Sequence, residues 1–198
     1  MGTIDWKHRC AIAVIKSHLS DNSVVLAWRV CFVRIGRDAR LARMRIAVIA
    51  VGKWKAGPER DLFEKYAGRL GWAVTLKEVE EHRKVPPAQL MAREGELLLA
   101  ALPKASSGLY TVALDQRGKA LSSEQLANHV RQWRDGGVDD LAFLIGGADG
   151  LSVAVRQKVD FILSLGAMTW PHLLVRSLLA EQLYRVESIL TGHPYHRA

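Results

Sequence analysis

Arg45-Ile-Ala-Val-Ile-Ala-Val51 is an aliphatic run that begins directly after Met44 and has the composition of a β-strand. Further along the chain, apolar runs of strand length alternate with amphipathic stretches of helical length. This alternation is the pattern of an α/β domain with a mostly parallel sheet. We predict strands over 45–51, 72–79, 108–115, 140–145 and 161–165, and helices over 58–70, 86–102, 122–135, 152–158 and 172–190.

The 43 residues that precede Met44 differ from the rest of the chain in charge. Residues 1–43 contain eight of the 28 Lys and Arg residues but only three of the 20 acidic residues, and they hold both cysteines. We therefore divide the chain into a basic N-terminal extension, residues 1–43, and one domain, residues 44–198. We expect the extension to be a short appendage, an RNA-binding arm, or upstream sequence translated from a start codon placed too early.

The composition is that of a globular protein. The chain has 198 residues, of which 49% are hydrophobic and 24% charged, and its mean hydropathy is +0.01. These values exclude a disordered or collagen-like chain. The apolar stretches 11–15 and 24–33 are too short to span a membrane. Since residues 44–198 contain no cysteine, we expect no disulfide framework, and we predict a cytoplasmic protein without a membrane partner.

Three loops follow predicted strands at their carboxyl ends, the edge where open α/β sheets bind ligands. They are Leu114–Gly118, Ile145–Gly150 and Leu165–His172. The second loop contains three glycines, which let a backbone approach a ligand closely and expose its amides. We expect a ligand to bind where these loops meet.

The glycine loop does not match two common ligand-binding motifs. A dinucleotide-binding loop has the pattern Gly-x-Gly-x-x-Gly after the first strand, whereas Gly146-Gly147-x-x-Gly150 has another spacing and follows the fourth. A phosphate-binding loop ends in Gly-Lys-Ser or Gly-Lys-Thr, and Gly150-Leu151-Ser152 lacks the lysine. His193 and His196 are three residues apart, but no third ligand accompanies them, so we expect no metal site.

The last helix and the chain end carry candidate RNA contacts. Tyr195, His196 and Arg197 come just before the final residue. Aromatic and guanidinium groups stack on unpaired bases, and histidine exchanges a proton near neutral pH. The alternative is an ordinary helix end stopped by a proline. Within the helix, a leucine-rich stripe between 174 and 190 recurs at helical spacing, which is typical of a core or of a dimer interface.

Motifs throughout residues 44–198 together carry a family resemblance. They are 44–53 (MRIAVIAVGK), Leu114-Asp115 with Gly118-Lys119, 144–152 (LIGGADGLS), 169–172 (TWPH), 174–176 (LVR), 180–185 (AEQLYR) and 192–197 (GHPYHR). With these motifs the domain resembles the RlmH family of ribosomal RNA large-subunit methyltransferases, a small member of the SPOUT superfamily.

The resemblance implies a fold, a cofactor and a reaction. The fold is an α/β SPOUT domain with a deep trefoil knot and a mostly parallel sheet, in a homodimer. The reaction transfers a methyl group from S-adenosylmethionine to ring nitrogen 3 of a pseudouridine in large-subunit (23S) ribosomal RNA. A sulfonium carries its own leaving group, so catalysis needs alignment and no metal. Because the domain has no added RNA-binding module, we expect it to act on assembled ribosomes.

The positions of the motifs assign residues to three roles. The resemblance implies cofactor contacts at Leu114, Gly146, Gly147, Leu165, Gly166, Ala167, Met168, Thr169 and Trp170. The candidate catalytic residues are His196 as proton acceptor, Asp149 as a second acceptor, and Tyr195. The candidate RNA contacts are Arg176, Arg185, Tyr195 and Arg197.

The chain departs from the family pattern at two places in these loops. The family often has Pro-Glu where this chain has Ala148-Asp149, and often Leu where it has Trp170. The acidic function is thus kept one methylene shorter, while the indole either stacks on the adenine or fills space. Two rival functions are a non-catalytic RNA-binding protein of the same fold and a nucleotide-binding regulator that does not contact RNA. A blocked cofactor loop would favour the first, and a dispensable tail would favour the second.

Overall fold

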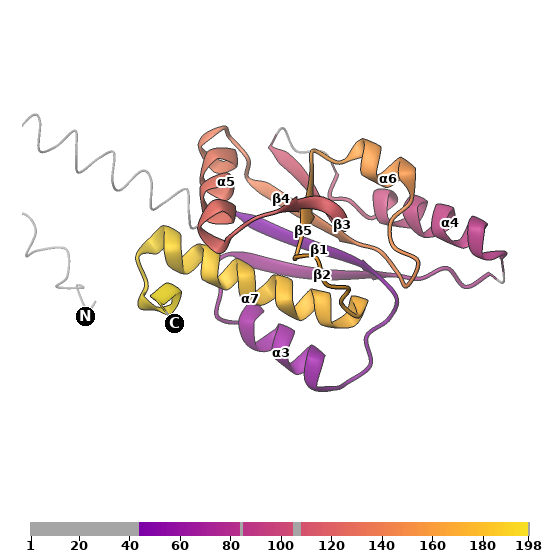
Figure 1. Ribbon diagram of the computed structural model, residues 1–198, viewed down its shortest axis with the longest axis horizontal. Coiled ribbons are helices and arrows are strands. Elements are labelled where there is room, and N and C mark those ends of the chain that lie inside the picture. Colours follow the sequence, from indigo (N-terminus) through magenta and orange to yellow (C-terminus); the bar gives the residue numbers. More distant parts are fainter. Residues whose placement is uncertain (1–43, 84, 105–107, 198) are drawn as a thin grey trace, which may run out of the picture. The chain divides into compact units, whose positions relative to one another are not determined.

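The computed structural model describes residues 44–83, 85–104 and 108–197, in which strands and helices alternate (Figure 1). The elements are β1 (Arg45–Val51), α3 (Pro58–Ala67), β2 (Ala73–Val79), α4 (Pro87–Ala100), β3 (Leu109–Ala120), α5 (Ser123–Asp135), β4 (Asp140–Ile145), α6 (Val153–Lys158), β5 (Phe161–Ser164), α7 (His172–Thr191) and the 3-10 helix η2 (Pro194–Arg197). Every strand and helix predicted from the sequence is confirmed. Its boundaries agree within three residues except at the end of β3. The predicted extension, residues 1–43, lies outside the described residues.

The strands form one sheet in the order β2-β1-β4-β3-β5, and each neighbouring pair is parallel. This confirms the predicted parallel α/β architecture. Because all strands point the same way, the loops that follow β3, β4 and β5 emerge at one edge of the sheet. The trefoil knot that the family resemblance implies stays a prediction.

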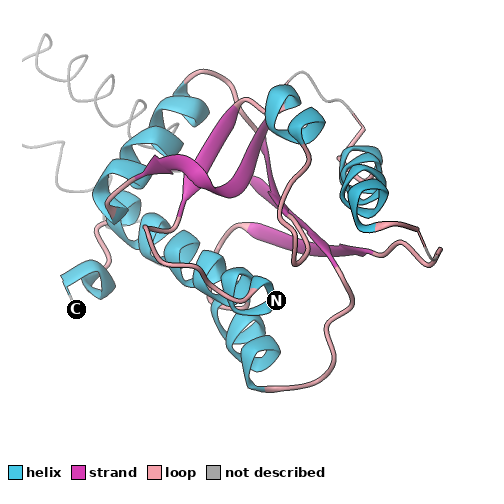
Figure 2. Cartoon of the chain, turned by 45° about the vertical axis from the view of Figure 1, so that its right-hand side comes forward, coloured by secondary structure: helices cyan, strands magenta, loops and turns pink. Residues whose placement is uncertain are grey.

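Helices cover both faces of the sheet, which explains why its central strands are apolar without interruption (Figure 2). In β1, Ile46 and Val48 belong to the core under α3, α5 and α7, whereas Ile49 and Val51 belong to the core under α4 and α6. All six residues of β4 are buried. A strand of this kind has no solvent face on which polar residues could alternate.

Strand β3 continues five residues beyond its predicted end because its pairing with β5 is irregular. Leu114 pairs with Leu163, and the register then shifts so that Lys119 pairs with Leu163 as well. At Gly118 a Cβ atom would lie 2.7 Å from the Ile162 backbone, so only glycine fits this approach. Residues 115–118, predicted as a loop, are therefore an irregular part of β3.

The best-marked helix start in the sequence forms as its residues dictate. The Ser122 hydroxyl accepts a hydrogen bond from the Gln125 N–H at 3.2 Å, and the Gln125 side chain accepts one from the Ser122 N–H at 2.9 Å. This capping box satisfies two N–H groups that would otherwise lack partners at the start of α5. It fixes α5 beside α7, where Ser123 donates to the Gln182 side chain at 2.8 Å.

The leucine-rich stripe of α7 is mostly core. Leu179, Leu183 and Val186 are fully buried, whereas Leu174 and Leu178 are only partly buried. The predicted choice between core and dimer interface is thus resolved in favour of the core for the central part of the helix. No helix in the described part of the chain is long and apolar enough to cross a membrane.

Candidate cofactor site

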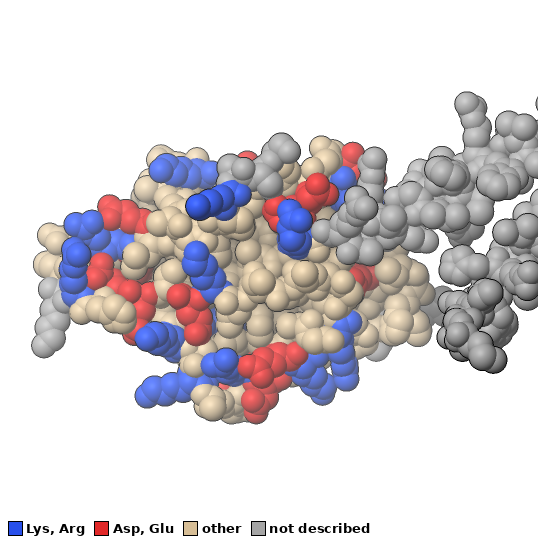
Figure 3. Space-filling model, turned by 180° about the vertical axis from the view of Figure 1, so that it is seen from behind, with Lys and Arg blue, Asp and Glu red and all other residues tan. Residues whose placement is uncertain are grey.

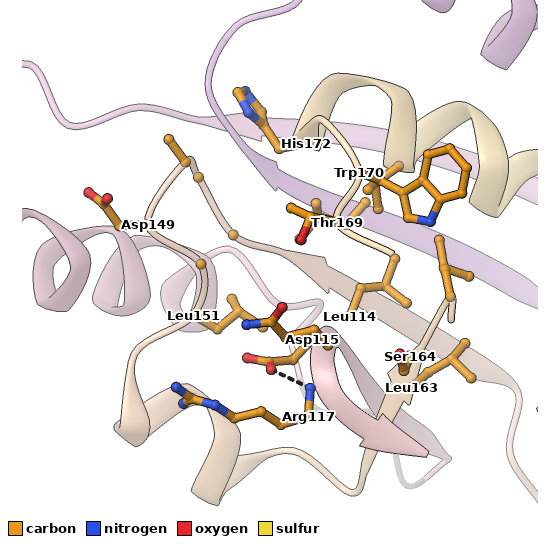
Figure 4. Close-up of a pocket in the computed structure, with 18 of the residues that line it drawn as sticks. Leu114, Asp115, Arg117, Asp149, Leu151, Leu163, Ser164, Thr169, Trp170 and His172 are labelled. Carbon is orange, nitrogen blue, oxygen red and sulfur yellow. Dashed lines mark hydrogen bonds between the residues drawn. The ribbon is translucent and has the colours of Figure 1, made fainter. Parts of the chain in front are cut away.

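A cavity of about 550 Å³ lies at the carboxyl edge of the sheet, where the three loops predicted from the sequence meet (Figure 4). Its walls come from the ends of β3, β4 and β5 and from the start of α7. Eight of the nine predicted cofactor residues line it, namely Leu114, Gly146, Gly147, Leu165, Gly166, Met168, Thr169 and Trp170. Ala167 lies between two lining residues without lining the cavity itself. The structure thus brings this predicted set together.

The glycine loop after β4 is shaped by its own backbone. A Cβ atom at Gly146 would lie 2.5 Å from the Gly150 carbonyl oxygen, a distance that no side chain tolerates. Gly150 has a φ of +82°, and its N–H donates to the Gly147 carbonyl oxygen at 3.1 Å. The glycines therefore make the turn possible, in addition to any close approach of a ligand that the sequence suggests.

The loop after β5 forms a second wall of the cavity. Gly166 has a φ of +113°, a conformation that favours glycine. The Ser164 hydroxyl lies 3.0 Å from the Gly166 carbonyl oxygen and 3.3 Å from the Gly166 nitrogen, which closes the turn. Met168 stands 66% exposed on this loop, unusually open for a large apolar side chain.

Trp170 stands between this cavity and a neighbouring one of about 530 Å³ that reaches the start of α5. Its indole Nε1 is buried, and no described residue accepts its hydrogen. A buried N–H without an acceptor costs free energy. Because this nitrogen has no accessible surface, a ligand in the cavity reaches it only if the indole shifts.

A charged cluster that the sequence did not reveal closes the floor of the cavity. Asp115 accepts from the Arg117 N–H at 2.9 Å and lies 3.3 Å from Arg156 Nη1. Arg156 also donates to the Leu151 carbonyl oxygen, so α6 ties the irregular part of β3 to the glycine loop. The sequence marked Asp115 only as part of a motif, and Arg156 is one turn into a short helix without any distinguishing pattern.

Asp149 lines the cavity, as expected for a catalytic candidate, and lies near a second carboxylate. Burial, with the nearby negative charge of Asp149 as a further cause, raises the pKa of Glu94 in α4. Glu94 is therefore a missed neighbour of the site. Nothing in the sequence of α4 distinguishes it from the other acidic residues of that helix.

His172 is the first residue of α7 and also lines the cavity. Burial lowers the pKa of its imidazole, and the positive charge of Arg176 one turn further along lowers it again. Arg176 itself is fully buried. Its guanidinium donates to Glu78 at 2.9 Å and to the Gly52 carbonyl oxygen at 2.8 Å.

These contacts correct the expectation that Arg176 binds RNA. The guanidinium has no exposed surface, and it lies with its centre 5.1 Å from the Trp54 ring centroid. A buried cation that is paired with Glu78 and bonded to two backbone carbonyls of the β1 end holds the start of α7 in place.

The chain end lies far from this cavity, at the other end of α7 (Figure 1). The Tyr195 hydroxyl lies 3.1 Å from the Glu181 carboxylate and 3.2 Å from the Tyr66 hydroxyl. Arg185 lies 4.9 Å from the Tyr195 ring centroid and pairs with Glu181 at 2.7 Å. Burial raises the pKa of Tyr195, so the phenol keeps its proton.

Helix geometry shows how far apart the two ends are. Glu181, which holds the Tyr195 hydroxyl, lies nine residues beyond His172, a distance of about 14 Å along α7 at 1.5 Å per residue. Tyr195, predicted to be catalytic, is therefore not brought to the cavity of its own chain. The side chains of His196 and Arg197 lie outside the described residues.

Among the residues that the structure describes, no three His, Cys, Asp or Glu side chains come together in a way that could hold a metal ion.

A parallel sheet covered by helices on both faces, with three loops around one cavity at its carboxyl edge, is typical of a ligand-binding α/β domain. The sequence profile described as "Predicted SPOUT methyltransferase" matches residues 44–196. The chain therefore belongs to the SPOUT methyltransferase family, which confirms the resemblance seen in its motifs. S-adenosylmethionine is the cofactor of this family.

Curated relatives cover the same residues. A protein of Paramagnetospirillum magneticum is 59% identical over 154 residues, 78% of this chain and 99% of the relative. A protein of Rhodospirillum centenum is 55% identical over 155 residues, 78% of this chain and 100% of the relative. Both are named "Ribosomal RNA large subunit methyltransferase H". A solved structure of a probable methyltransferase from Bordetella pertussis is similar with a TM-score of 0.49 and 16% identity, over 76% of this chain and 99% of that one.

Proposed function

We propose that this chain transfers a methyl group from S-adenosylmethionine to large-subunit (23S) ribosomal RNA. The observation that carries the proposal is the closing of three motif-bearing loops on one cavity, in a domain that matches relatives of that name over nearly their whole length. We propose ring nitrogen 3 of a pseudouridine as the methyl acceptor. The open cavity speaks against a non-catalytic RNA-binding protein of the same fold.

The residues of the cavity fit this cofactor. The glycine loop brings backbone to the cavity wall together with the side chains of Ala148 and Asp149, and the buried Trp170 N–H is a donor that lacks an acceptor in the described structure. We propose that Leu114, Gly146, Gly147 and the segment 165–170 hold the adenosine, with Trp170 as one wall. When bound, the cofactor supplies a methyl group on a positively charged sulfur. The sulfur is the leaving group and departs as a neutral thioether.

The second part of the proposal concerns the chain end. Tyr195 cannot reach the cavity of its own chain, since its hydroxyl is held by Glu181 and Tyr66 about 14 Å or more along α7 from His172. We propose a homodimer in which the tail of one subunit contacts RNA beside the cavity of its partner. Tyr195, His196 and Arg197 are then residues of the composite site, and Asp149 belongs to the subunit that holds the cofactor.

The surface charge is consistent with a large preassembled substrate. On the face drawn in Figure 3, Lys and Arg side chains are interspersed with Asp and Glu side chains instead of forming one basic patch. Affinity for naked RNA rises with the number of phosphates that cations contact. A mildly basic domain is better suited to the shape of the assembled ribosome, which we propose as its substrate in the cytoplasm.

The test is nucleoside mass spectrometry of ribosomal RNA from a strain that lacks the gene. The proposal expects one methylated pseudouridine to disappear and to return when the wild-type gene is supplied. A gene that encodes Gly146→Val should not restore it. An unchanged nucleoside profile in the deletion strain would contradict the proposed function.

A further inference from the structure

We infer that His172 is the residue that accepts the proton from the RNA base during methyl transfer. The inference rests on the proposed function and identifies a group for its reaction. Of the histidines that the structure describes, only His172 lines the cavity. It lies across the cavity from Asp115 and Arg117 (Figure 4).

The backbone that carries the imidazole is fixed, but the ring nitrogens are not engaged in hydrogen bonds with the described residues. No group among residues 44–83, 85–104 and 108–197 donates to it or accepts from it within hydrogen-bond distance. Its Nε2 would lie 3.9 Å from a Cβ atom at Gly52, so the ring faces the segment after β1, where the absence of a side chain leaves room beside it. Proline at 171 and the first turn of α7 fix the backbone that carries it.

The surroundings of the ring keep it neutral and therefore able to accept a proton. Burial and the charge of Arg176 both lower the pKa of His172. The start of a helix also disfavours a positive charge. The other charged groups on the elements around the ring are Glu78, already bonded to Arg176, Lys53 after β1, and Asp149 in the glycine loop.

An imidazole suits this proton better than the carboxylate of Asp149. A general base works best when its pKa lies near the working pH, and the ordinary pKa of an imidazole is close to neutral. Glu94, whose pKa burial raises, lies in α4 and does not line the cavity. His196, the acceptor predicted from the sequence, belongs to the tail. Contact with RNA is sufficient to explain a histidine at that position.

The step balances without a further reactant. The ring nitrogen of the base forms a bond to the methyl carbon while the bond from that carbon to sulfur breaks, and sulfur keeps the electron pair. The imidazole of His172 takes the proton that the ring nitrogen loses. The imidazolium then releases this proton to solvent, which restores the residue for the next turnover.

The experiment measures single-turnover methyl transfer to ribosomes from a strain that lacks the gene, as a function of pH. In His172→Gln we expect the rate constant at neutral pH to fall about 10²- to 10⁴-fold. Above neutrality the remaining rate should rise about tenfold per pH unit, because the imide then ionises by itself. Affinity for S-adenosylmethionine, measured by calorimetry, should change less than about threefold, that is by less than about 0.7 kcal/mol.

The matched control is His129→Gln. His129 packs against the rings of Trp133 and Phe161 outside the cavity, so its replacement should leave the pH profile unchanged. A second measurement that needs no RNA is the NMR titration of the His172 ring in the intact chain, which should give a pKa below the ordinary value.

Three results would overturn the inference. Wild-type turnover in His172→Gln, or a reduced rate with an unchanged pH profile, would show that the ring only supports the structure. The same alkaline rescue in His196→Gln, with none in His172→Gln, would assign the proton to the tail. If the wild-type protein transfers no methyl group to ribosomal RNA, the proposed function fails, and this inference fails with it.

Discussion

The two ends of α7 support function in different ways. At its start, the helix meets a cavity whose surrounding loops depend on glycine turns, at Gly146, Gly150 and Gly166. At its end, the chain folds back through side chains, with Tyr195 held by Glu181 and Tyr66. The helix has 20 residues and is about 30 Å long, and Glu181, which holds Tyr195, lies about 14 Å along it from His172.

This difference separates cofactor binding from the residues proposed to contact RNA. A site built from backbone turns tolerates few substitutions at its glycines, because the turn itself fails. A site built from surface side chains loses contacts one at a time. Since both carry motifs of the same family but lie too far apart within one chain, we expect damage to each end to have its own signature.

The largest effect is expected at the cavity. In Gly146→Val, a Cβ would lie 2.5 Å from the Gly150 carbonyl oxygen, so the glycine loop must change its path. We expect affinity for S-adenosylmethionine to fall more than about 100-fold, equal to about 3 kcal/mol, when measured by calorimetry. Gly57→Ala is the control, because its Cβ would make an ordinary contact of 3.5 Å far from the cavity. Binding of wild-type strength in Gly146→Val would remove the glycine loop from the site.

A chain that ends at Pro194 tests the other end. We expect methyl transfer to ribosomes to fall more than about 100-fold, as for the loss of contacts that align the RNA base with the methyl group. Affinity for S-adenosylmethionine should change less than about threefold, because Tyr195 does not reach the cavity of its own chain. Turnover of the truncated protein at the wild-type rate would show that the tail has no part in catalysis.

A smaller effect is expected where Trp170 separates the two cavities. Trp170→Leu places at this position the residue that the family often has, but removes the buried indole N–H and part of the wall. We expect a loss of cofactor affinity of up to about tenfold, or about 1.4 kcal/mol, with turnover retained. A complete loss of binding would contradict this prediction. It would mean that the indole is essential to the fold of this loop.

At the tail end, Glu187 gives a pH-dependent test of stability. Burial raises the pKa of this carboxyl, although it accepts the Gly71 N–H at 3.0 Å. The folded state therefore holds the proton more tightly than the unfolded state, so stability is lost as pH rises from about 4.3 through the raised pKa. Glu187→Gln avoids the charge and keeps an acceptor, and we expect it to increase the free energy of unfolding by up to about 1 kcal/mol at neutral pH.

Urea unfolding at two pH values checks this prediction. The gain should shrink as the pH falls toward 4.3, where the wild-type carboxyl is also neutral. Glu64→Gln is the comparison, since Glu64 is exposed and pairs with Arg60 on the surface of α3. A gain that does not depend on pH would exclude the buried charge as its cause.

The smallest effect is expected from the basic extension. A chain that begins at Met44 contains every residue that the family profile matches and all of the described cavity. We expect its cofactor affinity and its rate of methyl transfer to equal those of the full chain within about twofold. A loss of transfer with intact cofactor binding would identify residues 1–43 as an RNA-binding arm.

The sequence predicted the elements well because its strands are buried on both faces and its helices are amphipathic or capped. It also predicted which loops meet, since parallel strands end at one edge. It could not show that Arg176 is buried, because an arginine on a helix is usually solvated and only the fold brings Glu78 beneath it. Nor could it show that β3 continues through Gly118, since the close approach of β5 is a tertiary contact.

The same limit applies to the catalytic residues. Motif positions assigned Asp149, Tyr195 and His196 to one site, but a linear sequence contains no distances. The structure places Asp149 at the cavity and Tyr195 beyond the middle of α7. His172 ends the motif at 169–172, and its burial beside Arg176 is visible only in the folded chain.

The central claim is that the cavity and the tail of one active site come from different subunits, and subunit mixing tests it most directly. Gly146→Val and the chain that ends at Pro194 should each be inactive alone. After equal amounts are unfolded together and refolded, half of the dimers contain one intact cavity facing one intact tail. The account predicts recovery of about a quarter of the wild-type rate of methyl transfer to ribosomes. A mixture that stays as inactive as its two components would contradict it.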